Sequence, residues 1–348
     1  MLRAFKFRLW TNTNQERELG VMLETHRRLY NSALAQRKES WQERGAGIKY
    51  SEQQAILTAA RKEDEWLAKV NCSSAQVTLQ RLDQSFQNFF RRVKAGEKPG
   101  YPRFKARDRF DSFEYGSHGD GARLKGSRLR VQHVGTIRVC LHREVEGEIK
   151  TLSIKREADK WFVIAIAELP EPPKLGNINP AVGIDMGLEY FLSTSDGQHV
   201  ENPRYLKDEL PALRRAGRAV SRKKKGGHNR RKAVKALRRK HARVANLRRE
   251  HTHKAANNLI GRYGKIAVER LNIHGMVGNH GLARAISDAG WGRFIATLKS
   301  KAARAGVEIV EVNPRGTSQE CSGCGALVQK ALSVRVHRCE CALSCKET

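Results

Sequence analysis

The sequence predicts an α+β multidomain protein in which a first domain of helices and strands precedes an α/β second domain. Its 348 residues suffice for two domains of roughly 100–200 residues each. Helical periodicity in the first third gives way to strand-like alternation in the middle third. After a proline-rich segment at residues 170–180, apolar strands alternate with helical stretches, an order typical of an α/β domain.

The first domain is expected to begin with a strand and a helix. Residues 5–9 alternate between apolar and basic side chains, which is the period of a half-buried strand. Thr13 and Glu16 stand three residues apart and predict a capping box at the start of a helix. The apolar face expected for this helix consists of Leu19, Leu23, Leu29, Tyr30 and Leu34.

A second helical region and a β-rich segment follow. Residues 73–93 carry apolar side chains at helical spacing and are followed by Gly96 and Pro99. Several short alternating segments come next, and the last of them, residues 161–168, is strand-like. The prolines after it can continue neither a central strand nor a helix. We therefore place the first domain at 1–172, a linker at 173–180 and the second domain at 181–348.

Two strands of the second domain are expected to end in acidic residues. Residues 182–185 form an apolar segment that ends in Asp185, and a turn follows at residues 195–197. After a long helical stretch, residues 266–269 form another apolar strand that ends in Glu269. Buried strands that bring carboxylates to a common edge are how a two-metal phosphodiesterase holds Mg²⁺. Acids at strand ends are common in α/β proteins, so helix-capping or turn roles stay open on spacing alone.

The composition predicts a polyanionic partner. Lys and Arg number 66 against 36 Asp and Glu, so the formal net charge is +30. Nucleic acid is the first expectation, and an anionic membrane surface is the alternative. No apolar run approaches the ~20 residues of a spanning helix, and residues 1–6 lack an apolar signal segment. The sequence therefore predicts a cytoplasmic protein that binds nucleic acid.

Much of this charge lies in one block. Between Glu209 and Glu250 there are 17 Lys and Arg residues and no acid, and such a block repels itself unless a polyanion neutralises it. Gly226 and Gly227 predict a break between two helices. An apolar stripe at helical spacing argues against the alternative of a solvated tail; it consists of Val234, Leu237, Val244 and Leu247. The residues expected to contact nucleic acid are Arg222, Lys223, Lys224, Lys225, Arg230, Arg231, Lys232, Arg238 and Arg239.

The cysteines indicate a metal site. Five of the seven cysteines crowd the last 28 residues, which favours metal binding over disulfides in a reducing compartment. Unligated reduced thiols are the alternative. The second cysteine pair is one residue tighter than the usual C-x-x-C, and a site with four protein ligands would be structural rather than catalytic. The zinc ligands expected are Cys321, Cys324, Cys339 and Cys341, with His337 and Cys345 as substitutes.

A series of motifs in a fixed order resembles the TnpB family of transposon-encoded proteins. The motifs occupy residues 30–34, 80–90, 98–104, 182–188, 221–225, 268–272, 286–291 and 317–325, nearly the full length of the chain. The family has long been labelled OrfB-type transposase and is related to the type V CRISPR effector nucleases.

This resemblance implies a fold and a set of partners. The fold is an oligonucleotide-binding-like β-barrel with a helical insertion at about 13–95, then an α/β RNase H-like (RuvC) domain with a zinc ribbon at about 316–345. The partners are a guide RNA from the transposon end and a double-stranded DNA target. Base pairing reads the target while the protein reads a short flanking motif. The implied location is the nucleoid of a bacterial or archaeal cell.

The resemblance also assigns site residues and reveals a departure. Asp185 and Glu269 match the first two catalytic carboxylates of the family, which act with Mg²⁺, and the four cysteines match its structural zinc ligands. The family continues after its last cysteine pair into D-R-D-x-N-A-A, whereas Lys346 and Thr348 stand roughly where its two aspartates are. Carboxylates beside an ammonium group hold two metal ions poorly. The third carboxylate is missing, so we expect impaired cleavage.

Three explanations of this departure are open. The gene is C-terminally truncated and decaying, or the protein has become a guided binder that represses without cutting, or another acid rescues the nuclease. Asp288 is the candidate for rescue, although Ile286-Ser-Asp288 matches an ordinary family motif and is better interpreted as structural.

The function expected first is an RNA-guided DNA-binding protein. The alternatives are an active Mg²⁺-dependent RNA-guided DNA endonuclease and an unguided basic zinc protein that binds nucleic acid. A transposase that itself joins DNA ends is disfavoured, because nothing in the sequence indicates a separate strand-transfer apparatus.

Overall fold

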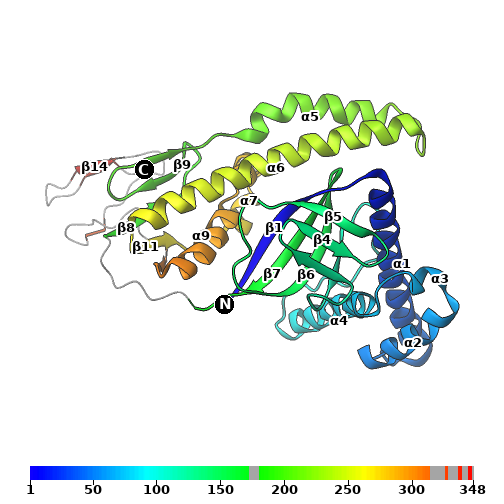
Figure 1. Cartoon of the computed structure of the whole chain (residues 1–348). Helices are drawn as coiled ribbons and strands as arrows, with labels where there is room; N and C mark the ends of the chain where they lie inside the picture. The colour runs from blue at the N-terminus through cyan, green and yellow to red at the C-terminus, as the bar shows by residue number, and fades with distance from the viewer. Residues whose placement is uncertain (172–179, 314–325, 328–335, 339–343, 347–348) are drawn as a thin grey trace. The chain divides into compact units, whose positions relative to one another are not determined.

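The structure is a computed structural model that describes residues 1–171, 180–313, 326–327, 336–338 and 344–346 (Figure 1). The chain divides into two compact units, Met1–Pro170 and Glu171–Thr348, and each is described by itself. Almost all of the expected linker and most of the expected zinc ribbon lie outside the described residues.

The first unit contains a seven-stranded antiparallel sheet with the order β2-β6-β7-β1-β5-β4-β3. The alternating residues 5–9 lie in its central strand β1, where Phe5 and Phe7 are fully buried, as the sequence predicted. The expected strand at 161–168 is β7, the neighbour of β1. The strands are β1 (Leu2–Trp10), β2 (Ser112–Tyr115), β3 (Ala122–Lys125), β4 (Arg128–Val131), β5 (Gly135–Cys140), β6 (Glu148–Glu157) and β7 (Lys160–Glu168).

All four helices described in the first unit lie between β1 and β2 along the chain. The predicted apolar face of α1 is confirmed, because Leu19, Leu23, Leu29, Tyr30 and Leu34 are all buried in the unit's core. The second predicted helix is α4, which packs on α1 and β2. The helices are α1 (Thr13–Arg44), α2 (Tyr50–Glu63), α3 (Glu65–Ala68) and α4 (Cys72–Lys94).

The capping box of α1 lies one residue earlier than predicted. The Asn12 side chain accepts a hydrogen bond from the Gln15 amide at 2.8 Å, and the Gln15 side chain accepts one from the Asn12 amide at 3.1 Å. Asn is a strong N-cap because its short amide oxygen reaches an unpaired amide of the first turn. Glu16 instead accepts from the Thr11 hydroxyl at 3.1 Å, so the prediction of Thr13 and Glu16 was wrong.

The second unit contains a five-stranded mixed sheet with the order β10-β9-β8-β11-β12. Strands β8, β11 and β12 are parallel, and β9 runs antiparallel to both of its neighbours. Val182 and Ile184 of β8 and Ile266 of β11 are buried in this unit's own core. The strands are β8 (Ala181–Asp185), β9 (Tyr190–Thr194), β10 (His199–Glu201), β11 (Lys265–Glu269) and β12 (Glu308–Val312).

Two long helices and three shorter ones accompany this sheet in the described part of the second unit. Helix α5 ends at Ser221 and α6 begins at His228, so the predicted break at Gly226 and Gly227 is confirmed. Gly226 has a φ of 82°, a left-handed conformation that glycine adopts without strain. The helices are α5 (Tyr205–Ser221), α6 (His228–Arg262), α7 (Ile273–Val277), α8 (Ala283–Ala289) and α9 (Trp291–Ala305).

The last described strands form a separate two-stranded antiparallel ladder. Strand β13 (Val336–Arg338) pairs with β14 (Ser344–Lys346), and His337 lies opposite Cys345 in the register. Among the described residues, no helix combines the length and the apolar character that a membrane span requires.

Candidate nucleic-acid interface and carboxylate site

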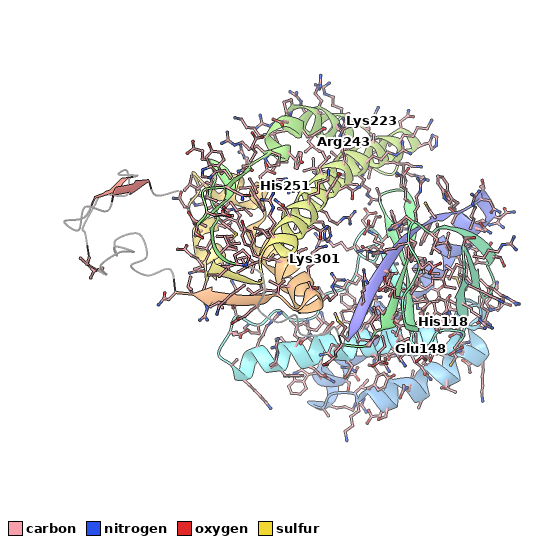
Figure 2. The ribbon with its side chains drawn as sticks, turned by 60° about the vertical axis from the view of Figure 1, so that its left-hand side comes forward. His118, Glu148, Lys223, Arg243, His251 and Lys301 are labelled. Atoms are coloured by element: carbon pink, nitrogen blue, oxygen red, sulfur yellow. The ribbon has the colours of Figure 1, made fainter. Side chains whose placement is uncertain are left out.

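The basic block of the sequence forms a helical hairpin, which we define as α5, α6 and the loop between them, residues 205–262. The two helices pack against each other, and Figure 2 shows Lys223 and Arg243 projecting from this hairpin. Leu213 of α5 and Val244 of α6 are buried, while Val234, Leu237 and Leu247 are half-buried. The predicted apolar stripe therefore belongs to a packed helix and not to a solvated tail.

The loop of the hairpin is the most exposed part of the block. Its four consecutive cations are all exposed, as are Arg231, Lys232 and Arg239, whereas Arg230 and Arg238 are half-buried. The loop cations are Arg222, Lys223, Lys224 and Lys225. Like charges at this density raise the local positive potential, which attracts a polyanion and steers its approach.

Two acidic residues, one on α5 and one on α8, form ion pairs with arginines of α6. Glu209 pairs with Arg243 at 3.1 Å. Arg248 donates to Asp288 from Nε at 2.9 Å and from Nη2 at 2.5 Å. Asp288 also accepts from the backbone amide of Leu206 at 3.0 Å, in the first turn of α5. The Asp288 side chain is 8 % exposed. Its carboxylate connects α8 to α5 and α6, because a negative charge is stabilised both by the N-terminus of a helix and by a guanidinium group.

Asp185 and Glu269 lie at the same edge of the second sheet. Their strands β8 and β11 are adjacent and parallel, and Ile184 pairs with Val268. The next residue on each strand is the acid, so both carboxylates follow the same register at the carboxyl ends of the strands. Ligand sites in open α/β sheets are found at this edge. Both residues are half-buried.

Asn313 extends this edge onto a third strand, and the sequence patterns had not indicated it as a site residue. Val312 pairs with Glu269 in the parallel β11–β12 ladder, and Asn313 is the exposed residue that follows it. The β-branched residues Ile309, Val310 and Val312 were the signal that could have predicted this strand. An amide oxygen can coordinate Mg²⁺ together with carboxylate oxygens. Within the described residues, no group of three His, Cys, Asp or Glu side chains is arranged to hold a metal ion.

The predicted zinc ligands Cys321, Cys324, Cys339 and Cys341 all lie outside the described residues. For the two substitute ligands, His337 and Cys345, the structure describes the backbone pairing of β13 with β14.

Comparison with known proteins identifies the family. A family profile described as "Probable transposase" (OrfB_IS605) matches residues 165–280. A protein of Streptomyces pristinaespiralis named "Putative RNA-guided DNA endonuclease" is 31% identical over 346 residues, which cover 97% of this chain and 85% of that protein. The chain belongs to the OrfB/TnpB family. The resemblance inferred from the motifs is therefore confirmed.

Two further family profiles match segments near the two ends of this OrfB/TnpB chain, and a second relative matches most of its length. A profile described as "Helix-turn-helix domain" matches residues 1–46, which form β1 and the single helix α1 in this structure. A profile described as "Cas12f1-like, TNB domain" matches residues 291–347. In Escherichia coli K12, "Putative RNA-guided DNA endonuclease InsQ" is 28% identical, over 97% of this chain and 87% of that one.

The fold is similar to that of a solved CRISPR effector. The protein chain of a Cas12f1-sgRNA-target DNA complex superposes with a TM-score of 0.57, at 12% sequence identity, over 94% of this chain and 92% of that chain. At this identity the similarity is one of fold. The α/β architecture with two sheets is thus shared with an effector of the Cas12 class.

Proposed function

We propose that this TnpB-family protein is an RNA-guided DNA-binding protein whose cleavage step is impaired. The observation that carries the proposal is the helical hairpin of residues 205–262, which presents a dense cationic surface on two helices packed against each other. Phosphates of a bound nucleic acid would neutralise this charge and release counterions. The relatives supply the guided part of the proposal, since they are named as RNA-guided DNA endonucleases.

The proposed partners are a guide RNA from the transposon end and a double-stranded DNA target. The similar Cas12f1 structure contains a single guide RNA and target DNA. In this mode, base pairing reads the target sequence while the protein holds the backbone and reads a short flanking motif. The compartment proposed is the bacterial or archaeal nucleoid.

We propose an RNase H-like (RuvC) nuclease ancestry for the second unit and an oligonucleotide-binding-like barrel for the first. Three parallel strands with an antiparallel pair at one edge support the RNase H-like assignment. The insertion of α1–α4 between β1 and β2 supports the assignment of a helical recognition region within the first unit.

Asp185 and Glu269 fit Mg²⁺, because two carboxylates at one sheet edge are the donor set that this hard cation prefers. Mg²⁺ would supply charge stabilisation for the attacking and leaving oxygens of a phosphodiester. By the motif resemblance, Lys346 stands roughly where one of the family's two C-terminal aspartates is, and a cation there would weaken metal binding. Asp288, the candidate for rescue, already accepts from Arg248 and from the start of α5.

An active Mg²⁺-dependent endonuclease is the second candidate function. The alignment of Asp185 with Glu269 on adjacent parallel strands favours it, because this alignment retains the first two positions of a nuclease centre. Asn313 at the same edge is a further oxygen donor.

One experiment separates these functions. RNA that copurifies with the protein is sequenced, and DNA matched or unmatched to it is tested for binding and for cleavage in Mg²⁺. We expect tight binding of matched DNA with little or no cleavage. Robust cleavage that Asp185→Asn abolishes would establish the second candidate. Equal binding of matched and unmatched DNA would instead indicate an unguided basic zinc protein.

We propose structural zinc at Cys321, Cys324, Cys339 and Cys341, because paired thiolates in a cytosolic protein commonly hold a ribbon too small to form its own core. Elemental analysis of protein purified under reducing conditions without chelator should show one zinc ion per chain. A chain free of zinc would contradict this proposal.

A further inference from the structure

A cavity in the first unit is rich in arginine. Its volume is about 410 Å³, and α1, α3, β6 and the segment before β2 line it. Five arginines line this cavity against two glutamates, Glu16 and Glu24. A planar guanidinium binds phosphate through paired hydrogen bonds, so an excess of arginine favours an anionic ligand with phosphate geometry. The arginines are Arg17, Arg27, Arg28, Arg107 and Arg156.

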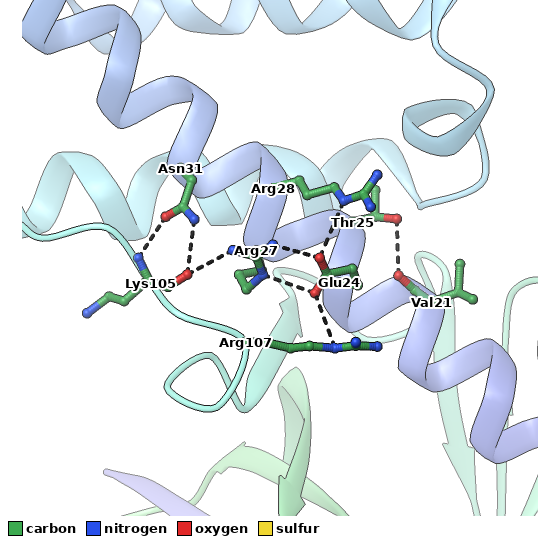
Figure 3. Close-up of polar contacts among 8 residues, drawn as sticks. All are labelled: Val21, Glu24, Thr25, Arg27, Arg28, Asn31, Lys105 and Arg107. Atoms are coloured by element: carbon green, nitrogen blue, oxygen red, sulfur yellow. Dashed lines mark hydrogen bonds and ion pairs between the residues drawn. The ribbon is translucent and has the colours of Figure 1, made fainter. Parts of the chain in front are cut away.

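Glu24 and Arg27 form the fixed part of this cavity (Figure 3). Arg27 donates to Glu24 from Nε at 3.0 Å and from Nη2 at 2.6 Å, and its Nη1 donates to the Lys105 carbonyl at 2.9 Å. Asn31 makes two further hydrogen bonds to the Lys105 backbone, at 2.8 and 3.0 Å. The hydrogen bonds from Arg27 lower the pKa of Glu24, so Glu24 stays an anion at neutral pH. The segment before β2 is thereby fixed against α1.

Arg28 and Arg107 are bound much more loosely. The Arg28 Nε lies 3.4 Å from Glu24, and the Arg107 Nε lies 3.9 Å from the other oxygen of the same carboxylate (Figure 3). Their side chains are 62 % and 80 % exposed. Exposed ion pairs at such distances contribute little to stability. A phosphate that approached from solvent could therefore take both guanidinium groups from Glu24 while Arg27 kept that carboxylate in place.

Trp66 supplies an aromatic wall beside these cations. Trp66 is 49 % exposed, and the Arg28 guanidinium carbon lies 5.6 Å from the centre of its ring. A second cavity of about 160 Å³ is also lined by Trp66 and Arg28, so these two side chains border both cavities. An exposed tryptophan beside arginine is the combination that stacks single-stranded bases and holds their backbone.

We propose that this cavity binds one unstacked nucleotide of a single-stranded segment, with its base on Trp66 and its phosphate between Arg28 and Arg107. A base inside a duplex stacks on its neighbours and leaves no free face for Trp66, so the ligand is single-stranded. Guide RNA and displaced DNA share this chemistry. The inference rests on the proposed function, because it takes a nucleic acid as the partner.

The test uses the full chain, freed of copurified RNA, and short RNA or DNA strands that carry a fluorescent purine analogue. The cavity variant combines Arg28→Gln, Arg107→Gln and Trp66→Ala. The control variant combines Arg123→Gln, Arg130→Gln and Trp41→Ala, which removes the same charge and one exposed tryptophan from other exposed positions. Thermal melts establish that both variants are folded.

We expect the wild-type chain and the control to quench the purine analogue by stacking and the cavity variant not to quench it. The cavity variant should bind roughly 5- to 100-fold more weakly, the range of one lost base stack. Its salt slope should fall by about 0.7, the loss of one single-strand phosphate contact. A preference for RNA over DNA would identify the guide as the source, and the reverse would identify displaced DNA.

Equal binding and quenching by the cavity and control variants would overturn the proposal, as would equally tight binding of an abasic strand. Binding of polyglutamate that the cavity variant loses and the control variant keeps would show that the cavity takes an acidic polypeptide instead. These failures differ from failure of the proposed function. A wild-type chain that bound neither single strands nor duplex would contradict both, whereas steep salt-dependent binding that the cavity variant left unchanged would contradict the cavity alone.

Discussion

His26 is a titratable side chain that is fully buried in the core of the first unit. Its Nδ1 lies 2.9 Å from the Thr78 hydroxyl and its Nε2 lies 3.2 Å from the Ser74 hydroxyl. The ring stacks on Phe113 with 5.0 Å between centroids. Burial lowers the pKa of His26 to about 3, with the positive charge of Arg81 as a smaller cause. The imidazole is therefore neutral in the folded protein.

This burial makes the protein sensitive to acid. The unfolded chain takes up a proton at His26 near pH 6.5 and the folded chain does not, so the contribution to stability is present above pH 6.5 and is lost as the pH falls. At pH 5 the loss should be about 2 kcal/mol. Urea unfolding at pH 7.5 and at pH 5 measures it. His26→Gln should remove this part of the loss, and exposed His280→Gln should not; an unchanged pH dependence in His26→Gln would refute the assignment.

Asp288 is the second residue whose role follows from its partners. The Arg248 side chain is 26 % exposed and that of Asp288 is 8 % exposed. Breaking a buried ion pair by removing one partner leaves the other charge uncompensated, so Asp288→Asn should destabilise the second unit by roughly 2–4 kcal/mol. Urea unfolding of Asp288→Asn, Arg248→Met and the double variant would measure the coupling. If Asp288→Asn abolished cleavage and left stability unchanged, Asp288 would be a catalytic acid rather than a structural one.

At the scale of secondary-structure elements, the helical hairpin of residues 205–262 combines a dense positive charge with apolar side chains that pack between its two helices. Helix α6 keeps Val244 buried although residues 210–249 contain no acid. Packing against α5 thus holds a helix whose charges repel one another, and the loop between the two helices carries four consecutive exposed cations.

The loop gives a clean test, because Gln substitutions at Arg222, Lys223, Lys224 and Lys225 remove four charges and no packing. We expect the slope of log K against log salt for duplex binding to flatten by about 3 to 4, at roughly 0.9 per phosphate contact. Binding titrations from low to physiological salt measure it. The charge-matched control replaces four exposed cations of β3 and β4. A wild-type slope in the loop variant would exclude the loop from the interface.

At the scale of the whole molecule, each unit has a hydrophobic core of its own. The full chain carries a net charge of +30, so like charges repel one another throughout the protein. Self-repulsion at this charge opposes compaction. Salt screens such repulsion, since the Debye length falls to about 8 Å at physiological ionic strength.

The free protein should therefore become more stable as salt is raised. Between about 50 mM and 300 mM salt we expect a Tm increase of several degrees, which corresponds to roughly 1–2 kcal/mol for a protein of this size. The nucleic-acid complex should respond in the opposite direction, because salt weakens phosphate contacts. Differential scanning calorimetry of both forms measures this contrast. A free protein that salt destabilised would show that attractive ion pairs outweigh the net repulsion.

Local patterns in the sequence were enough to predict several elements and the family. The alternation of residues 5–9, the apolar face of α1 and the glycine break after α5 were all confirmed, because each depends on neighbours within a few turns of chain. The family followed from motifs spread along the chain. The cap of α1 shows the limit of such patterns. Asn12 and Thr13 are both acceptable caps by type, and the structure selects Asn12.

Contacts between distant segments were decided by the tertiary structure alone. Asp185 and Glu269 are 84 residues apart, and their alignment depends on the parallel register of β8 with β11. Asp288 acquires its structural partners from α5 and α6, which no periodicity of α8 encodes. The arginine cavity joins α1 to Trp66 and Arg107 in the same way. Periodicity records which face of an element is buried, but the partner of that face is settled only when the whole chain packs.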